Sequence, residues 1–384
     1  MKVALLKCDK YELKLVKEKV REALDLIDGY NAIKKDSKVF IKLNCLGPFE
    51  KEKAITTNPT FVQAVIQLVK EKTNNIIVGD NPATKDLIFT LKKNGIYDVL
   101  IEENVQIVNG RKSTTITNTE YKFYQSFDVS EEMVEVDCMI NLPKLKTHGL
   151  AYMTCAQKNL FGLIYGLSKA GWHVKASNPL QFAEAINDLY SAILNKFKDK
   201  TLIHICDGII GLEGEGPGTT GIPKQANAIL ASFDAVSLDR VACEIVHMNP
   251  KRLFINNVAI ERKLGEGDLD KIEILGNNVE DFKDLYFLEP EDALNIFGLK
   301  LLKIKSIRNL VLEHPKIDHN KCIKCGECAH ICPPKAMTIE PKKYPKVKTS
   351  ACIRCWCCSE VCPKEAISKT KRPLIGRILL KNLN

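Results

Sequence analysis

The sequence contains no apolar run long enough to cross a membrane, because no segment offers the roughly 18 consecutive apolar residues that a span needs. Its first residues contain no hydrophobic stretch of the kind found in signal peptides. Aromatic residues are not interleaved with basic ones, as nucleic-acid-binding surfaces often require. We therefore expect a cytoplasmic protein with no transmembrane segment and no nucleic-acid partner.

Two nucleotide-binding signatures are also missing. The Gly-rich segment 211–218 follows a predicted strand, but it matches neither the Walker loop nor the GxGxxG fingerprint. A nicotinamide cofactor is therefore not supported. We interpret the segment as a flexible loop that could close over a ligand, with Gly216 as a candidate binding residue.

The length and the cysteine content point to two domains and to metal. A chain of 384 residues exceeds the roughly 250–300 residues at which a single core stops growing. The chain contains 15 cysteines. In a cytoplasmic protein, so many cysteines indicate metal ligands and not a disulfide framework.

Nine of these cysteines lie near the C-terminus, and eight of them form two runs with the same spacing, Cys-x2-Cys-x2-Cys-x3-Cys-Pro. This is the spacing of bacterial two-cluster ferredoxins, in which the last cysteine of each run binds the other cluster. The sequence therefore predicts two [4Fe-4S] clusters. We assign one cluster to Cys322, Cys325, Cys328 and Cys362, and the other to Cys332, Cys352, Cys355 and Cys358.

Zinc and disulfides are the alternative interpretations of the two runs. Zinc sites usually combine two separated Cys-x2-Cys pairs or include histidine. Disulfides need an oxidising compartment. The ninth cysteine, Cys357, interrupts the second run, and we expect it to lie beside a cluster without binding it.

The formal net charge of +9 is unevenly distributed along the chain. Residues 299–384 contain 19 Lys and Arg against 6 Asp and Glu. Because thiolate-bound clusters are anionic, we interpret much of this excess as a counter-charge for them. Residues 369–384 form a basic tail with several aliphatic residues, which either packs back on the protein or lies on a membrane surface.

Residues 1–290 alternate between strand-like and helix-like patterns. Apolar residues recur at helical spacing in 13–27, and 38–43 has the pattern of a strand. Asn58 followed by Pro59 is typical of a helix start. The alternation predicts an α/β domain with a mostly parallel sheet and helices on both faces.

We expect four parts in the chain. They are an α/β domain (residues 1–290), a connecting helix or linker (291–315), a small ferredoxin-like α+β domain (316–368) and the basic tail (369–384).

Polar residues follow several of the predicted strands. In parallel sheets, ligands bind outside the carboxyl ends of the strands, so a shared cleft is expected there. The residues at these positions are Lys42, Asn44, Cys45, Asp80, Asn81, Lys144, Lys146, His148, Asp207 and Gly208.

Motifs in residues 1–280 resemble the DUF362 family, a domain of unknown function often fused to ferredoxin modules. They include Ile41-Lys-Leu-Asn44, Asn141-Leu-Pro-Lys-Leu-Lys-Thr-His148, Lys158-Asn-Leu-Phe-Gly162 and Asp207-Gly-Ile209. The resemblance implies membership of that family, but it implies no particular reaction.

His148, Lys158 and His173 are also similar in spacing to a His…Lys…His pattern of the lactate racemase family, whose residues serve a nickel-pincer cofactor. The Gly-Gly-Arg-Lys context of that family is replaced here by Cys155-Ala-Gln-Lys158. The resemblance therefore implies the location of a site but not its cofactor. On the other interpretation, His148 caps a turn and Lys158 lies on a helix surface.

We predict that Lys146, His148 and Lys158 are catalytic. Lysine ammonium groups suit an anionic ligand, and imidazole transfers protons near neutral pH. The candidate substrate- or cofactor-binding residues are Lys42, Asn44, Asp80, Lys144, Asn159, His173, Asp207 and Gly216. Cys45 and Cys206 lie at or next to predicted strand ends, and they could belong to a further metal or cofactor site in the large domain.

The leading hypothesis is an iron–sulfur oxidoreductase. Its ferredoxin domain would exchange electrons with a soluble donor or acceptor protein and deliver them to an anionic small molecule or cofactor in the large domain, where covalent fusion gives a high effective concentration. One alternative is a non-catalytic electron carrier that docks its partners. Another is an isomerase or racemase-like enzyme with accessory clusters.

Overall fold

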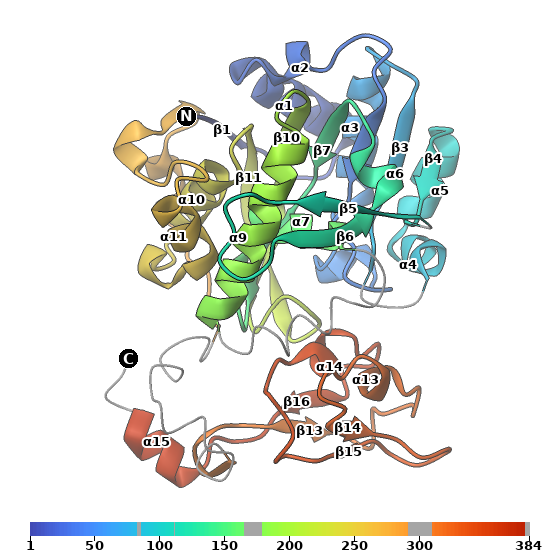
Figure 1. Ribbon diagram of the computed structural model, residues 1–384, viewed down its shortest axis with the longest axis vertical. Coiled ribbons are helices and arrows are strands. Elements are labelled where there is room, and N and C mark those ends of the chain that lie inside the picture. The colour runs from blue at the N-terminus through green and yellow to red at the C-terminus, as the bar shows by residue number, and fades with distance from the viewer. Residues whose placement is uncertain (83–85, 111, 165–178, 291–308, 381–384) are drawn as a thin grey trace.

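The computed structural model describes residues 1–82, 86–110, 112–164, 179–290 and 309–380 (Figure 1). Within these residues, ten strands form one sheet with the order β12-β1-β11-β10-β7-β2-β3-β4, and β8 and β9 are attached beside β10. The strands are β12 (Glu273–Gly276), β1 (Lys2–Lys7), β11 (Gly221–Ser232), β10 (Thr201–Gly214), β7 (Cys138–Asn141), β2 (Val39–Lys42), β3 (Ile76–Gly79), β4 (Gln106–Val108), β8 (Lys144–His148) and β9 (Tyr152–Thr154).

Most neighbouring strands of this sheet are parallel. The antiparallel pairs are β1 with β11, β10 with β11 and β8 with β9. The pairs from β10 through β7, β2 and β3 to β4 are all parallel. The predicted α/β class with a mostly parallel sheet is confirmed.

The central strands bury side chains on both faces, which explains their continuous apolar sequences. In β2, Val39 and Ile41 face one hydrophobic core, and Phe40 faces the other. In β7, Ile140 faces the same core as Val39 and Ile41, and Met139 faces the same core as Phe40. The sheet therefore separates two cores, each covered by helices.

Helices α1, α3, α4 and α5 cover one face, and α9, α10 and α11 cover the other. The predicted helix in 13–27 is α1, whose apolar stripe is buried, and the side chain of Asn58 caps α3 as expected by accepting from Thr60 N at 2.9 Å. The helices are α1 (Leu13–Leu26), α2 (Gly29–Ala32), α3 (Pro59–Lys70), α4 (Leu87–Asn94), α5 (Ile96–Glu102), α6 (Glu131–Val134), α7 (Ala156–Leu160), α9 (Pro179–Lys196), α10 (Ala235–Ile245) and α11 (Phe254–Glu261). A separate hairpin is formed by β5 (Ser113–Thr117) and β6 (Ser126–Ser130).

One part of the expected loop at 211–218 is a strand. Residues 211–214 belong to β10 and continue its ladder with β11, where Gly211 lies opposite Lys224 and Gly214 opposite Gly221. The loop prediction was wrong there because a long antiparallel ladder tolerates these glycines. Gly216 follows the ladder, and a Cβ at this position would lie 2.3 Å from the carbonyl oxygen of Thr147.

The small C-terminal domain has short antiparallel strands and lies at the bottom of Figure 1, against the large domain. Two strand pairs and two short helices surround the cysteines, and one further helix belongs to the basic tail. These elements are β13 (Pro315–Ile317), α13 (Glu327–His330), β14 (Met337–Thr338), β15 (Lys346–Val347), α14 (Cys357–Glu360), β16 (Ile367–Lys369) and α15 (Leu374–Leu380).

The first part of the basic tail, which includes α15, packs on the protein. Gly376 in α15 lies so close to Val311 that an added Cβ would come within 2.0 Å of the Val311 carbonyl oxygen. The expected connecting segment falls mostly in 291–308, outside the described residues. No helix in the described ranges has the length and apolarity needed to span a membrane.

Candidate functional site

Parallel pairing brings the carboxyl ends of β2, β3 and β7 to one edge of the sheet. Lys42 at the end of β2 lies in register with Gly79 of β3 and with Asn141 of β7. On the far side of β7, Asn141 is in register with His204 of β10. The polar residues that follow these strands are therefore neighbours in space, as the strand-end argument predicts.

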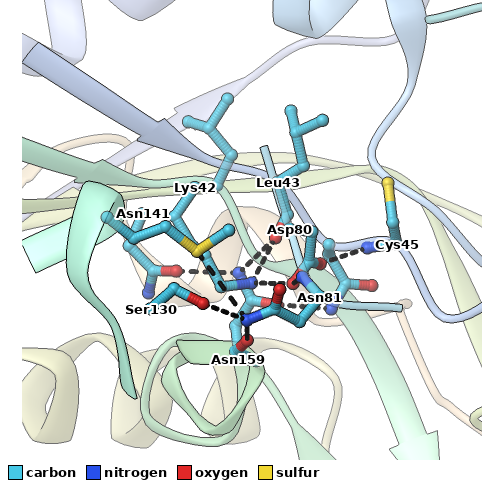
Figure 2. A network of polar contacts seen from close by, with 12 residues as sticks. Lys42, Leu43, Cys45, Asp80, Asn81, Ser130, Asn141 and Asn159 are labelled. Atoms are coloured by element: carbon cyan, nitrogen blue, oxygen red, sulfur yellow. Dashed lines mark hydrogen bonds and ion pairs between the residues drawn. The ribbon is translucent and has the colours of Figure 1, made fainter. Parts of the chain in front are cut away.

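Lys42 and Asp80 form a buried ion pair at this edge (Figure 2). Lys42 Nζ donates to Asp80 Oδ1 at 2.7 Å and to the Leu43 carbonyl oxygen at 2.7 Å. The other carboxylate oxygen of Asp80 accepts from Cys45 N at 2.7 Å. A Cβ at Gly162 would lie 2.4 Å from Lys42 Nζ, so only glycine fits against the pair. The charge of Lys42 is thus neutralised locally.

Lys144 and Asp207 form a second buried ion pair, with 2.8 Å between Lys144 Nζ and Asp207 Oδ2. Tyr11 completes a triangle, since its hydroxyl accepts from Lys144 Nζ and donates to Asp207 Oδ1, both at 2.7 Å. Asn58 N donates to Asp207 Oδ2 at 2.9 Å. Both charges are satisfied within the large domain, so this pair organises the sheet edge.

Lys146 is buried, and its hydrogen-bond acceptors among the described residues are neutral. Its Nζ donates to Asn44 Oδ1 at 2.6 Å and to the Ile55 carbonyl oxygen at 2.7 Å. Asn44 continues into a row of buried amides, donating to Asn159 Oδ1 at 2.6 Å, while Asn159 donates to Asn141 Oδ1 at 2.7 Å. Burial, together with the like charges of Lys158 and Lys144, lowers the pKa of Lys146 to about 7.

Lys158 is placed by α7, and its ammonium group lies over two aromatic rings. The Nζ atom is 4.9 Å from the ring centroid of Phe161 and 5.6 Å from that of Phe182. Burial lowers the pKa of Lys158, and the negative charge of Glu360 acts in the opposite direction. Among the described residues, neither Lys146 nor Lys158 has a carboxylate at ion-pair distance.

His148, at the end of β8, both caps a turn and lines the cavity described below. Its Nδ1 accepts from Leu150 N at 3.0 Å and from Ala151 N at 3.2 Å. Since Nδ1 is an acceptor, the neutral ring carries its proton on Nε2. The expected turn cap is thus present, while the catalytic role of His148 stays a prediction.

A cavity of about 120 Å³ lies between the sheet edge and the C-terminal domain. Lys146, His148 and Lys158 all line it. Its other wall comes mainly from the second cysteine run, including Cys357 and Glu360 of α14, with Ile331 from the first run. Burial raises the pKa of Glu360 to about 7, although the facing lysines act in the opposite direction. The full lining is Asn44, Cys45, Leu46, Asp80, Asn81, Lys146, His148, Thr154, Lys158, Asn159, Phe161, Gly162, Pro217, Ile331, Cys357, Glu360 and Val361.

The structure brings together six of the eleven residues predicted for the large-domain site. Those that line the cavity are Asn44, Asp80, Lys146, His148, Lys158 and Asn159. Lys42, Lys144 and Asp207 form the ion pairs beside it, Gly216 lines a neighbouring cavity that includes Trp356, and His173 lies outside the described residues.

Cys45 belongs to the core on one face of the sheet and Cys206 to the core on the other, and a further metal or cofactor site near these cysteines stays a prediction. Sequence reasoning also missed Glu360, whose only signal is its position in the cysteine run.

The C-terminal cysteines are grouped as a cluster-binding domain requires. The four cysteines predicted for the first cluster, including Cys362 from the second run, line one common cavity. Cys332 lies within electrostatic range of Cys352 and Cys355, the predicted ligands of the other cluster. This grouping fits [4Fe-4S] clusters and agrees with the predicted exchange of last cysteines between the runs.

No group of three or more His, Cys, Asp or Glu within the described ranges is arranged to hold a single metal ion. The grouping of the C-terminal cysteines is compatible with this, because the ligands of a cubane bind different irons and stand farther apart.

The two runs also share backbone geometry. Ala336 N donates to Cys332 Sγ and Ala366 N donates to Cys362 Sγ, both at 3.2 Å. Such hydrogen bonds to ligand sulfur help to set cluster potentials. The runs differ at one left-handed position, where Gly326 of the first is replaced by Trp356 of the second, with φ of 82° and 63°. A left-handed tryptophan is strained, and it lies beside the large domain.

Comparison with known families agrees with this arrangement. Residues 39–244 match the model of a domain of unknown function, DUF362, and residues 315–369 match a 4Fe-4S dicluster domain. The chain belongs to the DUF362 family. In this DUF362 protein the family domain contains both buried ion pairs and all three predicted catalytic residues, and the dicluster domain supports an iron–sulfur electron-transfer role.

The DUF362 chain is also 32% identical over 265 residues to the "Thylakoid-associated protein sll1697" of Synechocystis sp., covering 68% of this chain and 79% of that protein. Two solved structures are similar in part. They are the lactate racemase apoprotein from Thermoanaerobacterium thermosaccharolyticum (14% identity, TM-score 0.43, 64% of this chain) and a protein from Thermotoga maritima (13% identity, TM-score 0.38, 57% of this chain). The chain spans 56% and 55% of their lengths, and no inference about activity follows from them.

Proposed function

We propose that this protein is an iron–sulfur oxidoreductase that transfers electrons between a partner protein and a small anionic molecule bound in the cavity between its two domains. One observation carries the proposal. The cavity that contains Lys146, His148 and Lys158 is closed by Cys357 and Glu360, which belong to the same run as the ligand cysteines Cys355 and Cys358.

Lys146 and Lys158 select an anion. They are the lysines of the sheet edge that no large-domain carboxylate neutralises among the described residues, and both line the cavity. An anion that enters the cavity would accept hydrogen bonds from these two ammonium groups, in place of neutral oxygens and aromatic rings. Hydrogen bonds between charged groups are about twice as strong as neutral ones. A carboxylate or a phosphate group fits this chemistry.

His148 is placed to exchange a proton with the bound molecule. The two backbone N–H groups that donate to Nδ1 hold the ring in one orientation and keep the proton of the neutral ring on Nε2. Proton transfer by a positioned imidazole typically contributes 10²–10⁴-fold to a rate. The clusters, held by the eight cysteines of the two runs, would supply single electrons to this site.

The partner protein would dock on the far side of the C-terminal domain. Cys325 of the first run is exposed, and Ile323 beside it is 56% exposed. The second run, in contrast, faces the large domain. We infer that electrons pass between the partner and the first cluster, and between the second cluster and the cavity.

The test is a reoxidation experiment on anaerobically purified, cluster-loaded protein. After reduction with dithionite, which should bleach the brown colour, small carboxylates and phosphate esters are screened for recovery of the colour. We expect recovery to saturate with the concentration of an accepted anion. The Lys146→Met/Lys158→Met double variant should lose this saturation, because the anion is no longer held.

A viologen dye provides the control, because it takes electrons directly from exposed clusters and needs no anion site. Wild type and double variant should be reoxidised by the dye at equal rates. The proposal fails if dithionite never bleaches the colour, or if the double variant responds to every anion as wild type does.

A further inference from the structure

Two cysteines outside the C-terminal runs meet in the core of the large domain. The Sγ atoms of Cys155 and Cys206 are 3.3 Å apart, and the residues are 1% and 0% exposed. Cys206 lies in β10, one residue before Asp207, and Cys155 directly precedes α7. A disulfide requires an S–S distance of about 2.05 Å, so the sulfurs need to approach by only about 1 Å.

A buried carboxyl group lies against this thiol pair. Asp239 of α10 is 5% exposed, and it accepts from Ala156 N at 2.6 Å and from Gln157 N at 3.1 Å. Its carboxyl group also interacts with the Cys155 thiol. Burial raises the pKa of Asp239 to about 7, so the group can take up a proton near neutral pH. Thiol oxidation needs such an acceptor, because each thiol loses its proton.

The thiol pair is close to the cavity. Helix α7 begins after Cys155 and carries Lys158 and Asn159, which line the cavity together with Thr154. Three residues of helix rise by about 4.5 Å, so less than one turn separates Cys155 from Lys158 along the helix axis. Because both sulfurs are buried, a soluble reductant has no direct access to them.

We propose that Cys155 and Cys206 form a redox-active dithiol that exchanges electrons with the iron–sulfur domain, so that the protein stores an electron pair beside its cavity. This inference rests on the proposed function, since it needs clusters that deliver electrons there.

The step balances in atoms and electrons. In oxidation, two S–H bonds break and one S–S bond forms between Cys155 and Cys206. One proton goes to Asp239, and the other leaves through the cavity to solvent. The two electrons leave singly to the iron–sulfur domain, one for each cluster, because the dithiol is a two-electron couple and each cluster accepts one electron. Reduction reverses each of these changes.

Cys243 offers a matched control within the same core. It is also buried, but its Sγ donates to the Met248 carbonyl oxygen at 3.4 Å. Such a cysteine packs as a small hydrophobic residue. Replacing it with serine tests what the loss of one buried thiol does without touching the pair.

The experiment counts electrons in cluster-loaded protein that has been oxidised anaerobically and is then titrated with dithionite. Wild type should take up about four electron equivalents, two for the clusters and two for the disulfide. Cys155→Ser and Cys206→Ser should each take up about two, and Cys243→Ser about four. Iron content and absorbance confirm that each variant holds its clusters.

A second measurement keeps the inference testable even if a variant fails to fold. Oxidised wild-type protein is denatured in acid and its free thiols are alkylated. The masses of its peptides are then measured by mass spectrometry. We expect a peptide joining Cys155 to Cys206 that disappears after reduction.

The possible failures can be told apart. If the colour bleaches with two equivalents and both thiols are always alkylated, the proposed function stands and the dithiol is refuted. If the colour never bleaches, the proposed function fails, and this inference fails with it.

Discussion

Lys42 and Lys144 lie at the same sheet edge as Lys146 and Lys158, but the two sets have different surroundings. Lys42 and Lys144 each bond a buried aspartate at 2.7 and 2.8 Å. Lys146 bonds neutral oxygens, and Lys158 lies over aromatic rings. The aspartates therefore neutralise the charges of Lys42 and Lys144. The charges of Lys146 and Lys158 leave a positive potential in the cavity.

This difference separates lysines that stabilise the fold from lysines that bind a ligand. A buried ion pair whose hydrogen bonds are satisfied fixes the positions of its elements and adds little field beyond its immediate surroundings. A buried ammonium group without a counter-ion is costly, and its lowered pKa is a sign of that cost. Proteins keep such groups where a ligand compensates for them, so the second set marks the site.

The largest expected effect concerns the paired set. Lys144→Met leaves the Asp207 carboxylate buried with only Tyr11 and Asn58 as donors. Removing one partner of a buried pair costs about 3–5 kcal/mol, which should lower the Tm by roughly 10 °C. Thermal unfolding of the cluster-loaded protein, followed by circular dichroism, measures the change.

Lys93→Met is the control for this substitution. Lys93 bonds Glu50 at 2.7 Å, with side chains that are 49% and 60% exposed, and such surface pairs contribute little to stability. Its Tm should stay close to that of wild type. An unchanged Tm in Lys144→Met would mean that the two lysine sets are equivalent after all.

The sequence predicted the edge but not this division. Hydrophobic periodicity identified α1 and β2, and the parallel sheet then required the strand-end residues to be neighbours. The sequence did not show which lysines form ion pairs. Lys144 and Asp207, for example, are distant in the chain and meet only through strand register. All four lysines were therefore predicted to belong to the site, without a distinction between paired and unpaired ones.

The second wall of the cavity was beyond sequence reasoning for a related reason. Glu360 belongs to a different domain, and its contact with the cavity depends on how the two domains dock. The spacing of the cysteine runs is identical, so it gave no sign that the second run contributes most of the C-terminal wall of the cavity. The second run does differ visibly from the first, in Trp356 at the position of Gly326 and in the additional Cys357, but the meaning of these differences needed the structure.

The next effect concerns anion affinity. Lys146→Met removes a buried ammonium group that would bond the anion, and hydrogen bonds to charged groups are worth about 1.5–3 kcal/mol. Binding of oxalate, measured by calorimetry on cluster-loaded protein, should weaken by about 10- to 100-fold. Thermal stability should not fall, because no buried carboxylate loses its partner.

The same Lys93→Met variant serves as the control here, and it should bind oxalate like wild type. A large fall in the Tm of Lys146→Met, with unchanged affinity for oxalate, would place Lys146 with Lys42 and Lys144, the lysines that stabilise the fold.

The smallest effect is the pH dependence of the same binding. The pKa of Lys146 is about 7 without an anion, and an anion raises it, so binding takes up a proton above that pH. Oxalate affinity should be constant below about pH 7 and fall by up to tenfold, about 1.4 kcal/mol, for each pH unit above it. Carboxylates are fully ionised above about pH 6, so the charge of oxalate stays constant over this range.

The groups that face Lys146 are Lys158, Lys144, Glu360 and Cys45, and the pH profile must be separated from theirs. Glu360→Gln removes the carboxylate that the C-terminal domain contributes to the cavity, and the fall above pH 7 should persist in this variant because it originates in Lys146. In Lys146→Met the affinity should be lower and its fall above pH 7 should be weaker, since the Lys146 amine is no longer there to be protonated while Lys158 remains. A profile that is equally steep in both variants would show that another group controls binding, and the division between the two lysine sets would then lose its electrostatic basis.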